Sequence, residues 1–331
     1  MQLRDRKILV TGAAGFIGSH LSDRLAEANE LVLVDDFSVG LRENLDEAGR
    51  CENVQVVEAD IRDRERMLAL CEGIDVVFHL AISCLRTSLG RPFLSHDVNA
   101  GGTLSVCLAA RDREVPRLVY VSSSEVYGTA QTVPMSESHP CDPMTVYGAS
   151  KLAGELYALA CWRTYGLPVT VARPFNSYGP REPYSGQRAE VIPRFILQLE
   201  TGRSPVVYGD GTQTRDFTFV EDTVQGLLQI AELDEAAGEV VNVAFGQEAS
   251  ILRVAELLCR ITGRDGVEVV HDSPRPGDVD RHFADVSKAK RLFGFQPRVD
   301  LEMGLEHTVE WFRREHIAER VADGEAGTPN W

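Results

Sequence analysis

Residues 7–18 read KILVTGAAGFIG, an apolar strand pattern that runs into a glycine-rich turn and then a helical pattern. The spacing is G-x-x-G-x-x-G, with one more residue between the first two glycines than in the usual dinucleotide fingerprint. In such a turn Gly12 permits the tight bend, Gly15 lets the backbone approach a pyrophosphate, and Gly18 lets the helix pack on the sheet. The helix N-terminus, at Phe16 and Ile17, then offers N–H groups and a positive dipole end to the phosphates.

An acidic residue at the end of the next strand pattern supports a dinucleotide site. Asp35 lies 17 residues after Gly18, where a carboxylate can accept hydrogen bonds from ribose hydroxyls and repels a 2′-phosphate. No arginine immediately follows Asp35, so the sequence favours NAD over NADP. A second acid, Asp60, ends the third strand pattern beside Ile61. It either bonds the adenine amino group or caps the helix expected over residues 62–70.

Short apolar runs alternate with helical patterns through the first half of the chain, which is typical of parallel strands joined by crossover helices. We expect six buried strands, over Lys7–Thr11, Leu31–Val34, Val54–Glu58, Val76–Leu80, Leu118–Ser122 and Val169–Arg173. Helices are expected over Phe16–Ala28, Asn99–Asp112, Tyr147–Tyr165, Ile192–Thr201, Val220–Leu233, Ile251–Thr262 and Leu301–Glu315. Two further runs, Pro205–Tyr208 and Val240–Val243, are candidates for additional strands.

This order of elements predicts an α/β fold: a Rossmann-type doubly wound parallel sheet with a smaller, discontinuous C-terminal substrate-binding domain. We expect residues 1–173, together with about 217–245, to form the dinucleotide-binding domain. Residues 174–216 and 246–320 are expected to bind the substrate, and residues 321–331 to form a tail.

The composition excludes several classes of protein. With 44% hydrophobic and 25% charged residues, the chain is neither disordered nor fibrous. A formal net charge of −16 argues against a nucleic-acid partner. No apolar run approaches the roughly 20 residues that span a bilayer, and the N-terminus lacks a signal-peptide pattern. We therefore expect a cytoplasmic protein without a membrane partner.

The cysteines and the negative charge place two further limits on the site. Seven scattered cysteines without C-x-x-C spacing indicate reduced thiols, and we expect no metal site. A phosphate-bearing ligand would need a local cluster of arginine, lysine or backbone N–H groups that overrides the overall repulsion.

A tyrosine and a lysine form the candidate catalytic pair. Tyr147 and Lys151 are four residues apart, so they lie on one face of a helix. A nearby ammonium stabilises a phenolate, and the tyrosine can then take a proton from a substrate hydroxyl. The preceding strand ends in residues 122–125, SSSE, at the carboxyl edge of the sheet, where open α/β sheets bind ligands.

These motifs together resemble the extended short-chain dehydrogenase/reductases that modify nucleotide sugars, the epimerase/dehydratase group. The resemblance runs from Thr11 to about Phe312. It rests on the glycine turn, Asp35, His79-Leu80-Ala81, Asn99, residues 122–128 (SSSEVYG), Tyr147 with Lys151, and residues 173–181 (RPFNSYGPR), 214–217 (TRDF) and 275–278 (RPGD).

The resemblance implies an NAD-dependent enzyme with a nucleotide-sugar substrate, expected to be a UDP-sugar. In the group, residues matching Ser123 and Asn99 assist the tyrosine and steady the active site. Arg215 and Arg275 match arginines that grip the diphosphate, and Asn176 matches a residue that bonds its oxygens. The expected cofactor contacts also include Leu80, Ala81, Asn99, Lys151 and Pro174, and the expected substrate contacts include Arg86, Arg181 and Tyr208. Tyr208 either helps to form the nucleotide-base pocket or packs in the core.

The resemblance also implies a homodimer. The helices over Asn99–Asp112 and Tyr147–Tyr165 resemble the pair that forms a four-helix interface in this group. Leu152, Leu156 and Leu159 fit a partly buried helix face.

The reaction is less closely defined than the family. Members of the group oxidise the sugar transiently, usually at carbon 4, and a ketone there acidifies the proton on carbon 5. Glu125 is suited to be a general acid or base for that proton. The pair Ser124-Glu125 resembles uronate decarboxylases and some amino-sugar dehydratases, because 4,6-dehydratases usually have an aspartate at the first position. We favour chemistry at carbon 5, with 4-epimerisation, a net keto-sugar reductase and an idle NAD-binding regulator as alternatives.

Two segments depart from the group's pattern. The turn at residues 27–30, EANE, is one residue short and lacks the usual glycine. The segment at residues 82–88, ISCLRTS, is unfamiliar at its start and is expected to border the sugar.

Overall fold

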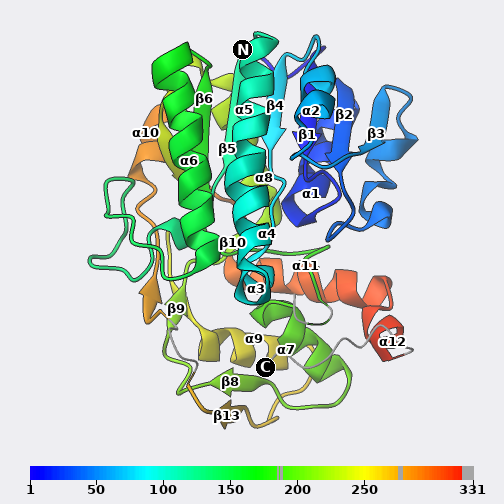
Figure 1. The fold of residues 1–331 in the computed structure, drawn as a ribbon. Helices are drawn as coiled ribbons and strands as arrows, with labels where there is room; N and C mark the ends of the chain where they lie inside the picture. Colours follow the sequence, from blue (N-terminus) through cyan, green and yellow to red (C-terminus); the bar gives the residue numbers. More distant parts are fainter. Residues whose placement is uncertain (185, 187–188, 275–278, 323–331) are drawn as a thin grey trace.

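The computed structural model describes residues 1–184, 186, 189–274 and 279–322. Its centre is a seven-stranded parallel sheet with the strand order β11-β6-β5-β4-β1-β2-β3 (Figure 1). The strands are β1 (Lys7–Thr11), β2 (Glu30–Asp35), β3 (Val54–Glu58), β4 (Val76–His79), β5 (Arg117–Val121), β6 (Val169–Pro174) and β11 (Val240–Val243). The strand order reverses between β1 and β4, so the predicted doubly wound fold is confirmed.

The six predicted strands are all present, each within one residue of its expected ends. The seventh, β11, forms from the candidate run Val240–Val243 and pairs with β6. Their near-continuous apolar sequence follows from their position in a parallel sheet that is covered on both faces.

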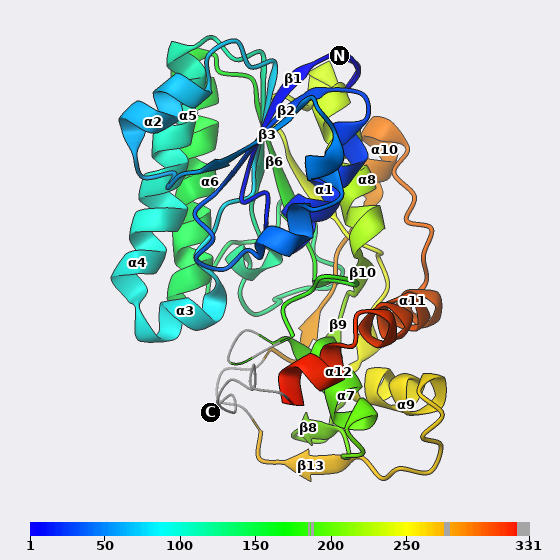
Figure 2. The same cartoon turned by 90° about the vertical axis from the view of Figure 1, so that its right-hand side faces the viewer.

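Helices cover both faces of this sheet (Figure 2). On one face lie α1 (Phe16–Ala26), α8 (Val220–Glu232) and α10 (Ser287–Phe293); on the other lie α2 (Arg64–Leu70), α5 (Thr103–Asp112) and α6 (Val146–Tyr165). Alternate side chains of β1 point to opposite faces. Ile8 and Val10 therefore pack in the core beneath α1 and α8, whereas Leu9 packs in the core beneath α5 and α6.

Helix α6 carries the candidate catalytic pair, and its start is defined by a cap. The Thr145 hydroxyl accepts the N–H of Gly148 at 3.0 Å, which begins the helix one residue before Tyr147. The helix ends at Gly166, whose φ of 74° places it in the left-handed region. The cap therefore places Tyr147 in the first turn, at the carboxyl edge of the sheet.

The helix predicted from Asn99 is regular only in its second part. Residues Asp97–Gly102 form a π-helix, η3, between α4 (Pro92–His96) and α5. The preceding helix is α3 (Leu85–Gly90), in the segment expected to border the sugar. Such π-helical turns often occur at functional sites, because the extra residue redirects side chains.

The second part of the molecule lies below the sheet in Figure 1. Its helices are α7 (Val191–Glu200), α9 (Ile251–Ile261), α11 (Leu301–Arg314) and α12 (Ile317–Arg320). Its strands are β7 (Ser177–Tyr178), β8 (Val206–Tyr208), β9 (Thr214–Arg215), β10 (Thr218–Phe219), β12 (Ala249–Ser250), β13 (Val270–Asp272) and β14 (Arg281–His282). The large-sheet part also contains short 3₁₀ turns between its helices and strands: η1 (Arg42–Leu45), η2 (Ala48–Arg50), η4 (Ser124–Val126) and η6 (Asp234–Ala236).

This second part has a hydrophobic core of its own, which includes Phe195, Ile196, Leu258 and Val309. Between β10 and β12 the chain returns to the large sheet as α8 and β11, so the second part is discontinuous in sequence. The boundaries expected for the two domains stay predictions.

Two further features of the described residues concern their helices and their cysteines. None of the helices in the described ranges combines the length and apolar character that crossing a bilayer requires. All seven cysteines lie within these ranges as free thiols.

Candidate active site

The glycine turn between β1 and α1 is shaped by close backbone contacts. Gly12 has a φ of 71°, and a Cβ there would lie 2.6 Å from the N atom of Ala81. A Cβ at Gly18 would collide with the carbonyl oxygen of Gly12. A Cβ at Gly15 would meet only that same oxygen, at 3.1 Å. Packing therefore explains Gly12 and Gly18, and a ligand's approach to the backbone is the stronger reason for Gly15.

The N-terminus of α1 is suited to a pyrophosphate. Within the described residues no side chain caps it and no acidic residue lies in its first turn, which begins with Phe16 and Ile17. The backbone N–H groups and the positive end of the helix dipole are therefore available to an anion. The turn fits the cofactor that the sequence predicts.

Asp35 ties the end of β2 to the glycine turn. Its Oδ2 accepts the N–H of Ala14 at 2.9 Å, and its Oδ1 accepts the N–H of Phe37 at 2.8 Å. Burial raises the pKa of the carboxyl, and these two hydrogen bonds oppose the shift. The carboxylate thus has a fixed position beside the glycine turn, whose Gly12 lies against Leu80 and Ala81 after β4.

Asp60 does not cap a helix. Its carboxylate accepts hydrogen bonds from the Arg62 guanidinium, which lower its pKa. The N-cap of α2 is Asp63, which accepts the N–H of Arg66 at 3.0 Å. The cap interpretation of Asp60 is therefore wrong, and its contact with adenine, like that of Ile61 with the cofactor, stays a prediction.

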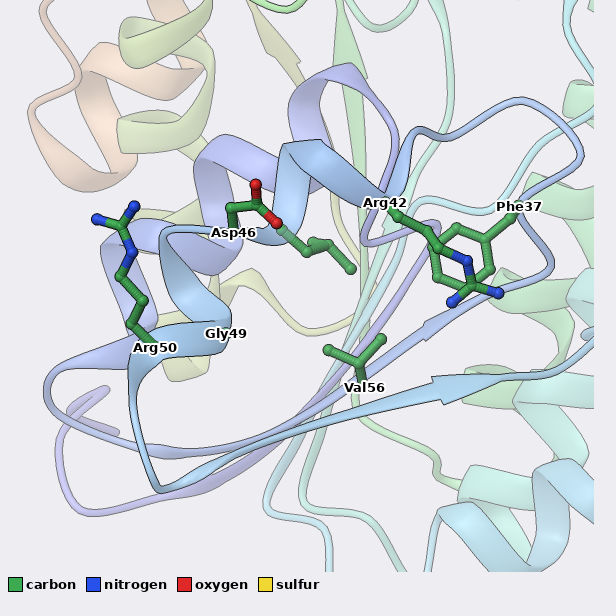
Figure 3. Close-up of a pocket in the computed structure, with 7 residues that line it drawn as sticks. Phe37, Arg42, Asp46, Gly49, Arg50 and Val56 are labelled. Carbon is green, nitrogen blue, oxygen red and sulfur yellow. The ribbon is translucent and has the colours of Figure 1, made fainter.

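Figure 3 shows a pocket of about 240 Å³ next to the loop that follows β2. It is lined by Phe37, Arg42, Leu45, Asp46, Gly49, Arg50 and Val56. The Arg42 guanidinium lies 3.8 Å above the centre of the Phe37 ring and also pairs with Glu58. None of the candidate catalytic residues lines this pocket, so it is separate from the reaction centre.

Asn99 ties the segment after β4 to α6. Its Oδ1 accepts the N–H of Ser83 at 2.7 Å, and its Nδ2 donates to the Ser83 carbonyl at 3.0 Å. Nδ2 also approaches the hydroxyls of Ser150 at 2.9 Å and Ser95 at 3.2 Å. The amide is completely buried in η3. These contacts support the steadying role that the resemblance implies; a direct contact with the cofactor stays a prediction.

His79 is buried and links three elements, although the motif that contains it gave no indication of a role. Its Nδ1 and the Thr11 hydroxyl share a hydrogen bond of 2.7 Å, and its Nε2 and the Thr103 hydroxyl share one of 3.0 Å. Burial, and then the charge of Lys151, lowers the pKa of His79 to about 3. The neutral imidazole therefore joins β1, β4 and α5 below the cofactor site.

Tyr147 lies against the end of β5, where Ser123 and Glu125 follow the strand. The Ser123 side chain hydrogen-bonds the Tyr147 hydroxyl, and Ser123 Oγ also accepts the N–H of Glu125 at 3.2 Å. Burial raises the pKa of Tyr147; the Ser123 hydrogen bond opposes the shift, and the charge of Glu125 adds to it. Ser124 is buried at the first position of η4. The structure thus gathers the predicted phenol, hydroxyl and carboxyl in one place.

Lys151 is buried, and its ammonium has a different partner from the one expected. Nζ donates to the carbonyl oxygen of Val121 at 2.7 Å and lies 4.4 Å from the centre of the Tyr120 ring. Burial lowers the pKa of Lys151 to about 7, and the charge of Glu155 opposes that shift. In this geometry burial, and not Lys151, dominates the pKa of Tyr147.

The residues expected to bind the substrate are spread over the second part. Arg215 Nη1 donates to the carbonyls of Thr214 and Val279, at 2.8 and 2.7 Å. Asn176 has a φ of 23°, and its buried Oδ1 has no hydrogen-bond partner among the described residues. Tyr208 ends β8, and Arg275 lies outside the described residues. Pro174, expected to contact the cofactor and not the substrate, ends β6 of the large sheet.

The two remaining arginines make ion pairs. Arg86 pairs with Glu190 at 3.1 Å, and Glu190 is close enough to Tyr147 to raise its pKa. Arg181 instead pairs with Asp23 of α1 at 2.5 Å and with Glu47 at 3.4 Å. Arg86 therefore pairs with a carboxylate near Tyr147, and its contact with the substrate stays a prediction, whereas Arg181 joins the second part to α1.

Sequence reasoning missed a buried ion pair beneath Lys151. Glu155, one turn further along α6, pairs with Arg173 of β6, and its Oε2 also accepts the Ser122 hydroxyl at 3.0 Å. Arg173 stands in the quoted motif and Glu155 lies four residues after Lys151, so the helical spacing was the available signal.

Comparison with known proteins identifies the family of this chain. The family model for the NAD dependent epimerase/dehydratase family matches residues 8–244. A UDP-glucose 4-epimerase of Mycolicibacterium smegmatis is 39% identical over 313 residues, covering 93% of this chain and 98% of that protein. UDP-glucuronic acid decarboxylase 1 of Xenopus tropicalis is 36% identical over 320 residues, covering 94% of this chain and 73% of that protein.

Solved structures show the same fold along nearly the whole chain. The UDP-N-acetylglucosamine 4-epimerase of Methanobrevibacter ruminantium, in complex with UDP-N-acetylmuramic acid, superposes with a TM-score of 0.90 at 34% identity. The superposition covers 94% of this chain and 99% of that one.

We predict that Asp35 sets the cofactor preference. The wild-type protein should bind NAD at least about tenfold more tightly than NADP, because the carboxylate repels a 2′-phosphate. Asp35→Asn should reduce that ratio, whereas Asp36→Asn, at the exposed neighbouring position, should not. Calorimetric titration with both cofactors measures the ratio. Equal affinity in the wild type would contradict the prediction.

We predict that the buried charge of Lys151 makes the stability of the apoprotein depend on pH. The folded-state pKa, about 7, is below the ordinary 10.5, so between these values the unfolded chain binds a proton that the folded chain does not. The wild type should therefore become more stable relative to Lys151→Met as the pH rises from 7, by at most about 1.4 kcal/mol per pH unit.

Urea unfolding at pH 7 and pH 9 measures this difference. Lys290→Met, a substitution of an exposed lysine on α10, is the matched control. The difference between its free energy of unfolding and that of the wild type should change little with pH. The prediction would be refuted if the free energies of unfolding of the wild type and Lys151→Met differed by the same amount at both pH values.

Proposed function

Because the chain belongs to the NAD-dependent epimerase/dehydratase family, its cofactor is NAD, and we propose that it oxidises carbon 4 of a UDP-linked hexose or hexuronate. The observation that carries the proposal is the Tyr147 phenol, hydrogen-bonded by Ser123 beside Glu125 and one helical turn from the buried Lys151. NAD supplies the hydride acceptor and later the hydride donor, so it is regenerated in each turnover.

In this proposal Tyr147 removes the proton from the sugar hydroxyl and Ser123 holds the phenol oxygen in place. Because burial raises the pKa of Tyr147, the phenol is protonated at neutral pH and needs nearby positive charge to become a base. Lys151, four residues along α6, is the chain's own source of that charge. Its contact with the Val121 carbonyl holds it at the edge of the sheet.

Glu125 supports chemistry at carbon 5. Its charge raises the pKa of Tyr147, so the carboxyl and the phenol act on the same small region. A carboxylate beside the phenol is suited to remove or return the proton on the carbon next to the oxidised one. The outcome would be 4,6-dehydration or decarboxylation of a uronate.

A second candidate is 4-epimerisation, in which the keto sugar rotates and receives hydride on its other face. The relative that is 39% identical is named UDP-glucose 4-epimerase, and the superposed structure is a UDP-N-acetylglucosamine 4-epimerase. In this reaction Glu125 would be a bystander.

The nucleotide is proposed to bind to the second part of the molecule. Arg215 and Asn176 are the diphosphate-binding candidates within the described residues, because a guanidinium and an amide both donate to phosphate oxygens. Seven free thiols support a reducing, cytoplasmic location.

Product masses in heavy water distinguish the reactions. The holoenzyme is incubated with UDP-glucose, UDP-glucuronate and UDP-N-acetylglucosamine in D₂O. We expect loss of water or of carbon dioxide, with deuterium incorporated next to carbon 4. A product of unchanged mass without deuterium, together with full activity of Glu125→Gln, would replace chemistry at carbon 5 by epimerisation. Tyr147→Phe, which should retain NAD binding, is the control that should lose nearly all turnover with every substrate.

We also propose that the enzyme is a homodimer that pairs through α5 and α6. These helices lie side by side in Figure 1. Leu156 is 53% exposed on α6, and Leu152 is half-buried, as a helix-pair interface requires. Leu159 is the exception: it packs inward on the sheet, so its expected place on this face is wrong.

Sedimentation tests the dimer. We predict a dimer at micromolar concentration and a monomer for Leu156→Glu, because a buried unpaired carboxylate destabilises an interface. Met303→Glu, at an apolar position of α11 with 43% exposure, should stay dimeric. A monomeric wild type would refute the proposal.

A further inference from the structure

The turn that carries the catalytic carboxyl is held by a residue from the other part of the molecule. The turn is η4 (Ser124–Val126), with Ser123 as its N-cap and Glu125 in its middle. The carbonyl oxygen of Ser124 accepts the N–H of Tyr127 at 3.1 Å, which closes the turn. The same oxygen accepts a second hydrogen bond, of 3.2 Å, from Nε2 of His282.

His282 belongs to β14, a strand of the second part. β14 pairs with β9 in parallel register, and the residue opposite His282 is Arg215. The N–H of Asp216 donates to the His282 carbonyl at 3.0 Å, which continues the ladder. Arg215 in turn donates to the carbonyl of Val279, just before β14. The diphosphate-binding candidate and His282 are therefore parts of one small sheet.

The imidazole of His282 is confined on its remaining sides. The residue is 3% exposed, and its ring lies 5.1 Å from the ring of Phe175, tilted by 32°. Phe175 immediately precedes Asn176, the other diphosphate-binding candidate. Phe175 also packs with Val126 and Tyr127, which end and follow the catalytic turn.

The protonation state of His282 is settled by this setting. Burial, and then the charge of Arg215, lowers the pKa of His282 to about 4, so the ring is neutral at neutral pH. A neutral imidazole has one N–H, and a carbonyl oxygen can only accept, so the proton is on Nε2. An apolar side chain could fill the same space but could not donate to the Ser124 carbonyl.

We propose that His282 is a positioning residue through which the nucleotide-binding strand β9 sets the geometry of the catalytic turn at residues 123–125. This proposal rests on the proposed function, because it assigns the diphosphate to Arg215. Binding of the nucleotide orders β9 and β14. The hydrogen bond from His282 to the Ser124 carbonyl then restricts the motion of Ser123 and Glu125. His282 touches neither the sugar nor the cofactor in this role, and acts through the carbonyl of Ser124.

The test compares His282→Leu, which removes the N–H, with His282→Gln, whose amide can donate from a similar position. Arg281→Gln is the matched control, because Arg281 is the neighbouring residue on β14, pairs with Glu248 and is half exposed. Each variant is prepared as the NAD-loaded holoenzyme, and its folding is checked by thermal unfolding. UDP is the probe for binding, measured by calorimetry, and for hydrogen exchange of the turn amides at residues 125–127.

In the wild type, UDP should slow exchange of these amides. In His282→Leu, UDP should bind within about twofold of the wild-type affinity but leave the exchange unchanged. Turnover of whichever of the three UDP-sugars is a substrate should then show kcat lowered at least about tenfold, with little change in KM. His282→Gln should restore most of kcat, and Arg281→Gln should behave as the wild type.

Three results would overturn the proposal, and they can be distinguished from one another. A wild-type holoenzyme that binds no UDP would overturn the proposed function and the coupling together. UDP binding with wild-type kcat and UDP-dependent protection in His282→Leu would overturn the coupling alone, as would His282→Gln being as impaired as His282→Leu while both fold.

Discussion

The burial of the Lys151 ammonium is the constraint on which the arrangement of the active site depends. A charged amine that is almost completely buried is unfavourable unless its N–H groups find acceptors and its charge finds compensation. The Val121 carbonyl accepts a hydrogen bond from the ammonium at the end of β5, and the face of the Tyr120 ring makes a cation–π contact with it. Glu155 supplies the opposite charge one turn along α6. These partners require α6 to lie against the ends of β5 and β6. That placement brings Tyr147, one turn earlier, to the hydroxyl of Ser123.

The same reasoning explains how far the sequence could predict the structure. The strands were predictable because both faces of a parallel sheet are covered, which produces short apolar runs that local sequence displays directly. Tyr147 and Lys151 were predictable as a pair because helical spacing alone brings them together. Leu156 and Leu159 show the limit: both are apolar and three residues apart, yet one is exposed and the other packs on the sheet.

The features that sequence could not provide depend on contacts between distant segments. His282 meets Ser124 across 158 positions of the chain, and Arg181 meets Asp23 across the same separation. Nothing in the local sequence distinguishes Arg181, which holds α1, from Arg86, which pairs with a carboxylate near Tyr147. The tertiary bonds of Asn99 in the π-helix η3 likewise join segments that are distant in the sequence.

The second part of the molecule shows why such distant contacts matter for its chemistry. Its strands β9, β10, β12 and β14 have two residues each, too few for a ladder to hold them firmly. Asp216, which is completely buried, accepts the N–H groups of Phe245, Gly246 and Ala284 and so joins β9 to the loop after β11 and to the chain after β14. Burial raises the pKa of Asp216 to about 7, and these hydrogen bonds oppose the shift. The short strands of the second part thus depend on one carboxylate, as the position of α6 depends on one ammonium.

The groups around Tyr147 hold its phenol in the protonated form. After burial, the groups that raise the pKa of the phenol are Glu125, Cys84 and Glu190, and the Ser123 hydrogen bond opposes them. A phenol in this field holds its proton firmly, so forming the phenolate that can act as a base is the difficult step. Positive charge near the phenol is therefore what formation of the phenolate most needs, and a buried lysine whose pKa is about 7 changes its charge near neutral pH. The packing of α6, which sets the depth of Lys151, therefore also sets the pH below which the chain itself can supply that charge.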